Sequence, residues 1–205
     1  MIDAPKFFAT IRTQLFAGTL TQRQVDGINA ILAEWVLRAL SDLRWLAYML
    51  ATVYWETGQR MWPISEEGGN AYFFRMYDIA GERPGVARLL GNLFAGDGIL
   101  FHGAGLVQLT GRRNFEHMTQ LIGARFGVDL EKNPEKALVL EIAIAIMFEG
   151  MLRADSHFGD FTGVALENYF SASADDPLGA RKIINGTDHA DDIAKIYRTF
   201  LEALS

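Results

Sequence analysis

The chain has 205 residues, a length that fits one domain, or one lobed domain, with a sizeable core. Half of its residues are hydrophobic and the mean hydropathy is +0.09, which argues against a disordered chain. The net charge of −6, the pI near 5.2 and the lack of a dense Lys/Arg stripe argue against nucleic acid as the main partner.

Helices dominate the predicted secondary structure, beginning near the N-terminus. Thr21 and Gln24 form a capping box ahead of a helix that runs to about Val36, with apolar residues on its inner face. Ser41 or Asp42 starts the next helix, which is also apolar on one face. The two segments predict two helices with apolar faces, the second of which ends near Gly58.

The second half of the chain predicts a buried central helix and a C-terminal amphipathic one. Asn133 and Pro134 give a start signal, an N-cap followed by proline at the first helical position. The helix that they open, Glu135 to about Arg153, is apolar nearly all round through its middle and should be buried. Another helix follows Asp188. Glycine-rich loops are predicted over 66–70, 81–105 and 156–179.

We expect neither a membrane span, nor a cofactor, nor a metal site. The most apolar run, residues 142–148, is too short to cross a bilayer. No signal peptide is recognisable at the N-terminus, so synthesis in the cytoplasm is expected. Cysteine is absent, and the histidines are scattered without ligand spacing. They are His102, His117, His157 and His189.

A short glycine-bracketed run, FHGAGLVQLTGRRNF over residues 101–115, is the most informative segment of the chain. If its middle is extended, Gln108 and Thr110 lie on one face, and Val107 and Leu109 lie on the other. One face would anchor on a core while the other offers an amide and a hydroxyl to a ligand. The alternative is a tight hairpin beside the core. A dinucleotide loop is unfavoured, because its glycine pattern would need glycine at position 108.

Glu56 is the first candidate for acid chemistry. It lies at the end of the second predicted helix, near Gly58, where unpaired carbonyl groups present partial negative charge. Apolar neighbours, among them Trp55 and Trp62, surround it in sequence. Both effects disfavour an ionised carboxylate and predict a raised pKa, which suits a general acid. The alternative is a helix-end glutamate in solvent or paired with Arg60.

Three segments, in order, resemble glycoside hydrolase family 19, the family of chitinases and of related phage and bacterial endolysins. WETG over residues 55–58 resembles the family's catalytic ETG, and GAGLVQLT over 103–110 resembles its GxGxxQLT cleft signature. RKIING over 181–186 resembles its IING motif. The resemblance covers roughly residues 40 to 204, and the N-terminal segment is similar to the endolysin branch.

The resemblance implies a mostly α fold of the lysozyme-like α+β kind. Such a fold is a helical domain around a substrate cleft, with a small extended or β element beside it. We therefore expect a single domain over residues 1–205, on which the N-terminal helices of residues 1–40 pack.

The same resemblance implies an inverting pair of carboxylates. Glu56 would be the acid, and a PIxE pattern of the endolysin branch selects Glu66 as the base, with Glu67 as the fallback. An inverting pair lies about 6.5–9.5 Å apart, which leaves room for the attacking water. Thr110 aligns with a residue that helps to hold this water. The alternative for residues 66–67 is a solvated acidic turn.

Amides and aromatic rings complete the implied substrate cleft. Gln108, Asn114 and Asn185 align with amides that hold sugar hydroxyl or acetamido groups. Tyr72 is a candidate for stacking against a sugar ring. It belongs to an aromatic stripe that would otherwise be core, namely Tyr72, Phe73, Phe74 and Tyr77.

Two positions depart from the family pattern. Ala104 stands where the family usually has arginine, and this loss of a cation puts catalytic efficiency in doubt. Trp55 stands where histidine is more usual before the catalytic glutamate, which is tolerable if the position packs.

The sequence as a whole predicts an endolysin-type hydrolase that cleaves β-1,4 bonds of peptidoglycan. We expect a monomer that is made in the cytoplasm and acts in the periplasm or cell wall after holin-type release. Two alternatives stay open: a chitinase acting on N-acetylglucosamine polymers, and a catalytically weakened cell-wall-binding relative.

Overall fold

The structure of the protein, a computed structural model, describes residues 2–153 and 161–205, and its contacts divide them into two compact units. The first unit holds residues 2–62, 151–153 and 162–205, and the second holds residues 63–150 and 161. The chain leaves the first unit after Trp62 and returns to it once the second unit has been traversed. The single domain expected over residues 1–205 stays a prediction.

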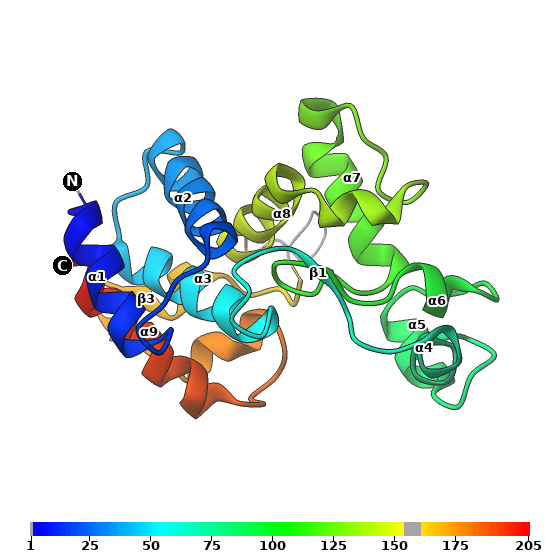
Figure 1. The fold of residues 1–205 in the computed structure, drawn as a ribbon. Coiled ribbons are helices and arrows are strands. Elements are labelled where there is room, and N and C mark those ends of the chain that lie inside the picture. The colour runs from blue at the N-terminus through cyan, green and yellow to red at the C-terminus, as the bar shows by residue number, and fades with distance from the viewer. Residues whose placement is uncertain (1, 154–160) are drawn as a thin grey trace. The chain divides into compact units, whose positions relative to one another are not determined.

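Four helices carry the core of the first unit: α1 (Ala4–Gln14), α2 (Gln22–Leu37), α3 (Leu43–Glu56) and α9 (Ala190–Leu204). Among them, α3 packs mainly against α9, and α1 lies beside α9 (Figure 1). Fully buried side chains such as Phe7, Leu46 and Phe200 fill the space between these three helices. Shorter elements follow: η2 (Leu166–Asn168), β3 (Phe170–Ser171), β4 (Ala174–Asp175) and η3 (Gly179–Ile183).

Side-chain caps start α2 and α3 where the sequence predicts. The Thr21 hydroxyl accepts a hydrogen bond from the Gln24 N–H at 3.2 Å, and the Gln24 Oε1 accepts one from the Thr21 N–H at 2.8 Å. The predicted capping box is thereby confirmed. Asp42, and not Ser41, caps α3, because its Oδ1 accepts the Arg44 N–H at 3.0 Å.

The second unit is built from short helices and one small antiparallel pair of strands. Its elements, in order, are β1 (Ile64–Ser65), α4 (Asn70–Tyr77), α5 (Pro84–Leu89), α6 (Asp97–Leu100), β2 (Ala104–Gly105), α7 (Arg112–Phe126), η1 (Pro134–Leu138) and α8 (Leu140–Leu152). The last residues of α8 are counted with the first unit. No helix within residues 2–153 or 161–205 is long and apolar enough to cross a membrane.

The helix predicted from Glu135 onward is divided in two. Pro134 opens only the 3₁₀ helix η1, since Val139 takes an extended conformation with ψ 128° before α8 begins. Asn133 does not act as a cap, because its side-chain amide donates instead to the Asp129 carbonyl at 3.2 Å. The predicted burial is confirmed: residues 142–148 are at most 7% exposed.

The run at residues 104–109 forms a tight hairpin and not an extended strand. Ala104 and Leu109 form an isolated antiparallel bridge, and Gln108 at the turn has a left-handed φ of 54°. Ala104 also pairs with Ser65 of β1. Leu106, Val107 and Leu109 are all buried, so the alternative of a hairpin packed beside the core describes this segment.

Candidate active site

Glu66 lies directly after β1 in the second unit, and both of its carboxylate oxygens are held. Its Oε1 accepts a hydrogen bond from the Tyr77 hydroxyl at 2.8 Å, and its Oε2 accepts one from the Gly103 N–H at 3.0 Å. The Glu66 N–H in turn donates to the Gly103 carbonyl at 2.7 Å. Strand pairing thus fixes the backbone and two neutral donors fix the side chain, which is only partly exposed.

Only a glycine fits at position 103 without a shift of its neighbours. A Cβ there would lie 2.9 Å from the Gln108 Oε1 and 3.0 Å from the Glu66 Oε2, closer than such atoms normally approach. The first glycine of the GxGxxQLT segment therefore allows the backbone N–H to reach the carboxylate.

Tyr77, at the end of α4, is a site residue whose role the sequence did not reveal. Burial raises the pKa of its hydroxyl well above the usual value, and its hydrogen bond to the Glu66 carboxylate adds to the rise. The hydroxyl therefore stays protonated and serves as a permanent donor. Its position in the aromatic stripe predicted a sugar-stacking ring or a core residue.

The other members of the predicted stacking wall divide between core and surface. Phe73 is 4% exposed and stacks on the His102 ring, with centroids 4.2 Å apart and an interplanar angle of 10°. Tyr72 is partly exposed and meets Phe73 and Tyr77 edge-on. The alternative of a core residue therefore describes Phe73, while the sugar contact of Tyr72 stays a prediction.

Three predicted site side chains, the substrate-binding Gln108 and Asn114 and the water-holding Thr110, donate to backbone carbonyls around the hairpin. The Gln108 amide donates to the Ile64 carbonyl at 3.2 Å and to the Gly105 carbonyl at 3.3 Å. The Thr110 hydroxyl donates to the Gln108 carbonyl and the Asn114 amide donates to the Thr110 carbonyl, both at 2.8 Å. All three side chains are partly exposed, and they stabilise the turn beside Glu66. Their sugar contacts and the water-holding role of Thr110 stay predictions.

Glu56 is the last residue of α3 in the first unit, and it forms an ion pair with Arg181. The Arg181 Nη1 donates to the Glu56 Oε1 at 2.5 Å, while its Nε donates to the Asp188 carbonyl at 2.8 Å. The arginine side chain is 3% exposed and the glutamate side chain 14%. Arg181 opens the RKIING segment, a signal that the sequence interpretation did not use.

Thr57 and Gly58 both have a structural role in the turn that follows Glu56. The Thr57 side chain is fully buried, donates to the Val53 carbonyl at 2.6 Å and accepts the Met61 N–H at 3.0 Å. Gly58 follows with a left-handed φ of 52°, which ends the helix at low cost. The segment therefore holds the carboxylate at a fixed helix end.

The two departures from the family pattern are accommodated by packing. Ala104 is 7% exposed and lies within the hairpin, and the cation that pairs with Glu56 in the first unit is Arg181. Trp55 packs against the ring of His189, with centroids 4.7 Å apart.

Asn185 is exposed, and its side-chain amide has no hydrogen-bond partner among the described residues. Its backbone N–H donates to the Arg181 carbonyl at 3.0 Å, which places it next to the arginine of the ion pair. Within residues 2–153 and 161–205, no three His, Cys, Asp or Glu side chains gather as metal ligands. His157 lies outside the described residues.

Comparison with known proteins finds similar folds among solved structures. No protein-family model and no curated protein matches the chain. Chitinase C from Streptomyces griseus HUT6037 matches 99% of this chain and 92% of its own, with 16% identity and a TM-score of 0.55. A chitinase C mutant matches with the same coverage and identity and a TM-score of 0.54. A bacterial family 19 chitinase matches 100% of this chain and 95% of its own, with 17% identity and a TM-score of 0.53.

These likenesses extend over nearly the whole of each chain and concern the fold. The protein has a family 19 chitinase-like fold, and the predicted mostly α, lysozyme-like fold class is confirmed.

Proposed function

We propose that the protein is an inverting glycoside hydrolase that cleaves β-1,4 bonds between the amino sugars of bacterial peptidoglycan. The observation that carries the proposal is a pair of glutamates, each held by protein donors in its own unit. Glu56 is held by Arg181, and Glu66 is held by Tyr77 and Gly103. The chitinase-like fold over nearly the full chain length supports the same reaction class.

Glu56 would act as the general acid. Arg181 occupies the Oε1, whereas the Oε2 has no hydrogen-bond partner among the described residues. A proton on this second oxygen would pass to the glycosidic oxygen as the bond to the anomeric carbon breaks. The ion pair would stabilise the carboxylate that remains after the transfer.

Glu66 would act as the general base. Its two donors leave lone pairs on both oxygens, and one of these would accept a proton from the attacking water. The water oxygen would bond to the anomeric carbon from the side opposite the leaving group, which inverts the configuration. In this mechanism Thr110 helps to position the water. The reaction requires the two carboxyl groups to lie about 6.5–9.5 Å apart in the working enzyme.

Peptidoglycan is our preferred substrate because the N-terminal segment is similar to the endolysin branch and the chain has no cysteines, unlike a plant-type secreted chitinase. Gln108, Asn114, Asn185 and Tyr72 would contact its sugars. The second candidate is a chitinase, which the solved chitinase structures favour. Further proposals are that the enzyme is a monomer and that it acts in the periplasm or cell wall after holin-type release.

The decisive experiment incubates the purified protein with peptidoglycan and, separately, with soluble chitin oligomers, and identifies the products by mass spectrometry. We expect muropeptide release from peptidoglycan and an inverted anomer by NMR. A Glu56→Gln/Glu66→Gln double variant is the control for contaminating activity. Chitin cleavage alone would select the chitinase, and wall binding without new reducing ends would select the weakened binding relative. Size-exclusion chromatography with light scattering tests the monomer.

A further inference from the structure

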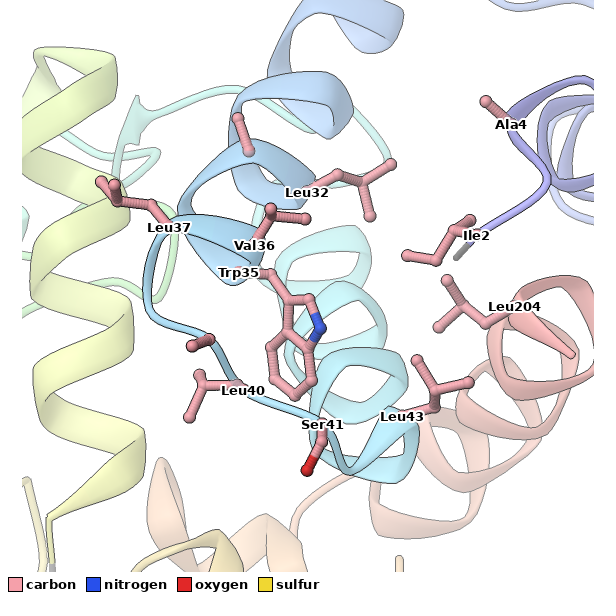
Figure 2. Close-up of a pocket in the computed structure, with 12 residues that line it drawn as sticks. Ile2, Ala4, Leu32, Trp35, Val36, Leu37, Leu40, Ser41, Leu43 and Leu204 are labelled. Atoms are coloured by element: carbon pink, nitrogen blue, oxygen red, sulfur yellow. The ribbon is translucent and has the colours of Figure 1, made fainter.

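An apolar pocket and a buried amide have no role in the proposed reaction steps. In the first unit, Ile2 and Leu204 border the pocket, which none of the candidate active-site residues lines (Figure 2). In the second unit, the side chain of Asn92 is fully buried and bonds to Tyr77, the residue whose hydroxyl holds Glu66. Of these two features, it is therefore the Asn92 amide that is connected to the candidate site.

Asn92 lies in the loop between α5 and α6, and both ends of its side-chain amide are hydrogen-bonded. The Nδ2 donates to the Tyr77 carbonyl at 2.9 Å, and the Oδ1 accepts the Arg112 N–H at 2.8 Å. These partners are the last residue of α4 and the first residue of α7. The last carbonyl groups and the first N–H groups of a helix have no partner within their own helix. One planar, uncharged group therefore satisfies an end of each of the two helices.

The first of these bonds fixes the backbone of Tyr77. The Tyr77 hydroxyl donates to the Glu66 Oε1 at 2.8 Å, so the position of the helix end sets where this donor lies. The next residue, Asp78, is also fully buried, and its Oδ2 accepts the N–H groups of Gly96 and Gly98 at 2.7 Å and 3.2 Å. The loop between α5 and α6 and the start of α6 are thereby bonded to two successive residues at the end of α4.

The second bond fixes the start of α7, which directly follows Thr110. Gly111 at the N-cap position has no side chain to cap the helix, and the Asn92 amide supplies an acceptor from a distant segment. The two segments are in contact, because a Cβ at Gly111 would lie 2.5 Å from the Leu90 carbonyl oxygen. Within the first turn, the Asn114 amide donates to the Thr110 carbonyl at 2.8 Å. The Asn92 bond therefore also limits where Thr110 can lie.

We propose that Asn92 is a positioning residue, which sets the spacing between the Glu66 carboxylate and the Thr110 hydroxyl. It acts through Tyr77 on one side and through the start of α7 on the other. This role rests on the proposed function, in which Glu66 activates the attacking water and Thr110 helps to position it. Because a displacement near 1 Å can cost about 10²-fold in rate, a rigid link between the two groups that contact the water favours turnover.

The test variant is Asn92→Asp, which has almost the same shape, keeps the acceptor for the Arg112 N–H and removes the donor to the Tyr77 carbonyl. We expect kcat on soluble peptidoglycan fragments to fall about fivefold, the factor that one hydrogen bond contributes. KM should change by less than about twofold, since the buried side chain touches no substrate. Asn133→Asp is the matched control, because this exposed amide also donates to a backbone carbonyl, and it should leave kcat unchanged.

Other bonds hold the same segment, so the variants should fold. The Asp97 carboxylate, for example, accepts a hydrogen bond from the Arg112 Nε at 2.9 Å. Asn92→Ala, which removes both amide bonds without adding a charge, should also lower kcat with little change in KM, and it serves as the test if Asn92→Asp does not fold. A normal kcat in a folded variant at position 92 would overturn the proposal.

A double-mutant cycle with Tyr77→Phe tests the route of this effect. If Asn92 acts through the Tyr77 hydroxyl, Asn92→Asp should lower kcat by less than about twofold once that hydroxyl is absent. Independent effects of the two substitutions would instead show that Asn92 supports the fold in general, and they would overturn the positioning role.

A measurement that needs no activity separates the role of Asn92 from the proposed function. The chain has 6 tyrosines, and after labelling with 3-fluorotyrosine the ¹⁹F NMR signal of Tyr77 is identified by its loss in Tyr77→Phe. Asn92→Asp should shift this signal, and Asn133→Asp should leave it in place. An inactive wild type would contradict the proposed function alone, whereas an unmoved Tyr77 signal in Asn92→Asp would overturn the role of Asn92.

Discussion

The two candidate carboxylates are ordered in different ways. Glu56 in the first unit has a charged partner, the buried Arg181, on one oxygen, and no partner on the other among residues 2–153 and 161–205. Glu66 in the second unit has two neutral partners, the Tyr77 hydroxyl and the Gly103 N–H, one on each oxygen. Hydrogen bonds to an ionised carboxylate are charge-assisted at both sites, but the neutral donors of Glu66 restrain its direction without adding a counter-charge.

This difference suits the two proposed roles. An acid must carry a proton before the reaction and a negative charge after it, so a cation on one oxygen stabilises the product state of Glu56. A base must begin ionised and keep free lone pairs, so neutral donors that hold Glu66 in place suffice. Substitutions of the partner residues can therefore test the two roles separately.

The largest expected effect is the loss of either carboxylate. Glu56→Gln and Glu66→Gln should each keep the fold and lower turnover by about 10²–10⁴-fold, since proton transfer is lost. Glu67→Gln, which changes the exposed neighbour, should retain near-normal turnover. The rates at which the folded variants hydrolyse peptidoglycan test this prediction. A reversal between positions 66 and 67 would assign the base to Glu67.

The next largest effect is expected where the Gly103 backbone approaches the Glu66 carboxylate. Gly103→Ala should lower turnover because its Cβ pushes on the Glu66 carboxylate, but by less than the about 10²-fold that a displacement of 1 Å can cost. Gly85→Ala is the control, since a methyl group at that position would meet nothing within 4 Å. Equal kinetics for the two variants would show that the Gly103 contact does not position the base.

Removal of the charged partner should affect stability as well as activity. Arg181→Met leaves Glu56 without its cation and the Asp188 carbonyl without its donor. We expect the free energy of unfolding to fall by about 1.5–3 kcal/mol in urea titrations. Lys182→Met, the exposed neighbour, should change it little. An unchanged unfolding midpoint for Arg181→Met would mean that the ion pair adds no net stability.

Asp97 is a third carboxylate, and like Glu56 it has a charged partner, so it extends the comparison to pH. Burial alone would raise the pKa of Asp97, but hydrogen bonds from Arg112 and the Phe94 N–H hold it below the usual 3.8. A lowered pKa stabilises the fold above pH 3.8, and this stability is lost as the pH falls through the folded-state value.

Asp97→Asn should therefore lower the free energy of unfolding by about 1.5–3 kcal/mol at pH 7, with a smaller difference from wild type at pH 3.5. Urea titrations at both pH values measure this. Asp129→Asn, at an exposed Lys132 pair, is the control and should change little. A difference that does not vary with pH would contradict the ion pair as the cause.

The smallest effect is expected at Tyr77. Tyr77→Phe removes one of the two donors that hold the Glu66 carboxylate, so the base is less firmly oriented and turnover should fall by less than in Gly103→Ala. Tyr169→Phe, in the first unit, should leave turnover unchanged. Equal turnover for Tyr77→Phe and wild type would leave the tyrosine a packing role only.

Local signals predicted much of the fold. The capping box at Thr21 depends on residues three apart and starts α2 as expected. The apolar run at residues 142–148 predicts a buried helix, because a helix that is apolar on all sides is stable only inside a core. The start at Pro134 was misassigned, since the competing hydrogen bond from Asn133 to Asp129 and the extended Val139 are not visible in propensity.

The site residues show the same limit. Glu56 and Glu66 were found through short motifs, but their partners come from distant segments. Arg181 lies far along the chain from Glu56, and Gly103 meets Glu66 only through the pairing of β1 with β2. Pairings of this kind depend on tertiary structure, so the sequence does not predict them; its nearest basic candidate for an ion pair with Glu56 is Arg60.

The packing of α3 against α9 has a consequence for how the chain folds. The two helices flank the entire second unit in sequence, so the core of the first unit depends on contacts of high sequence separation. During synthesis, α3 emerges from the ribosome long before its partner, while every element of the second unit up to α8 emerges before α9. The second unit can therefore begin to fold first. The apolar face of α3 stays exposed until α9 has been synthesised, and during that time it is prone to aggregation.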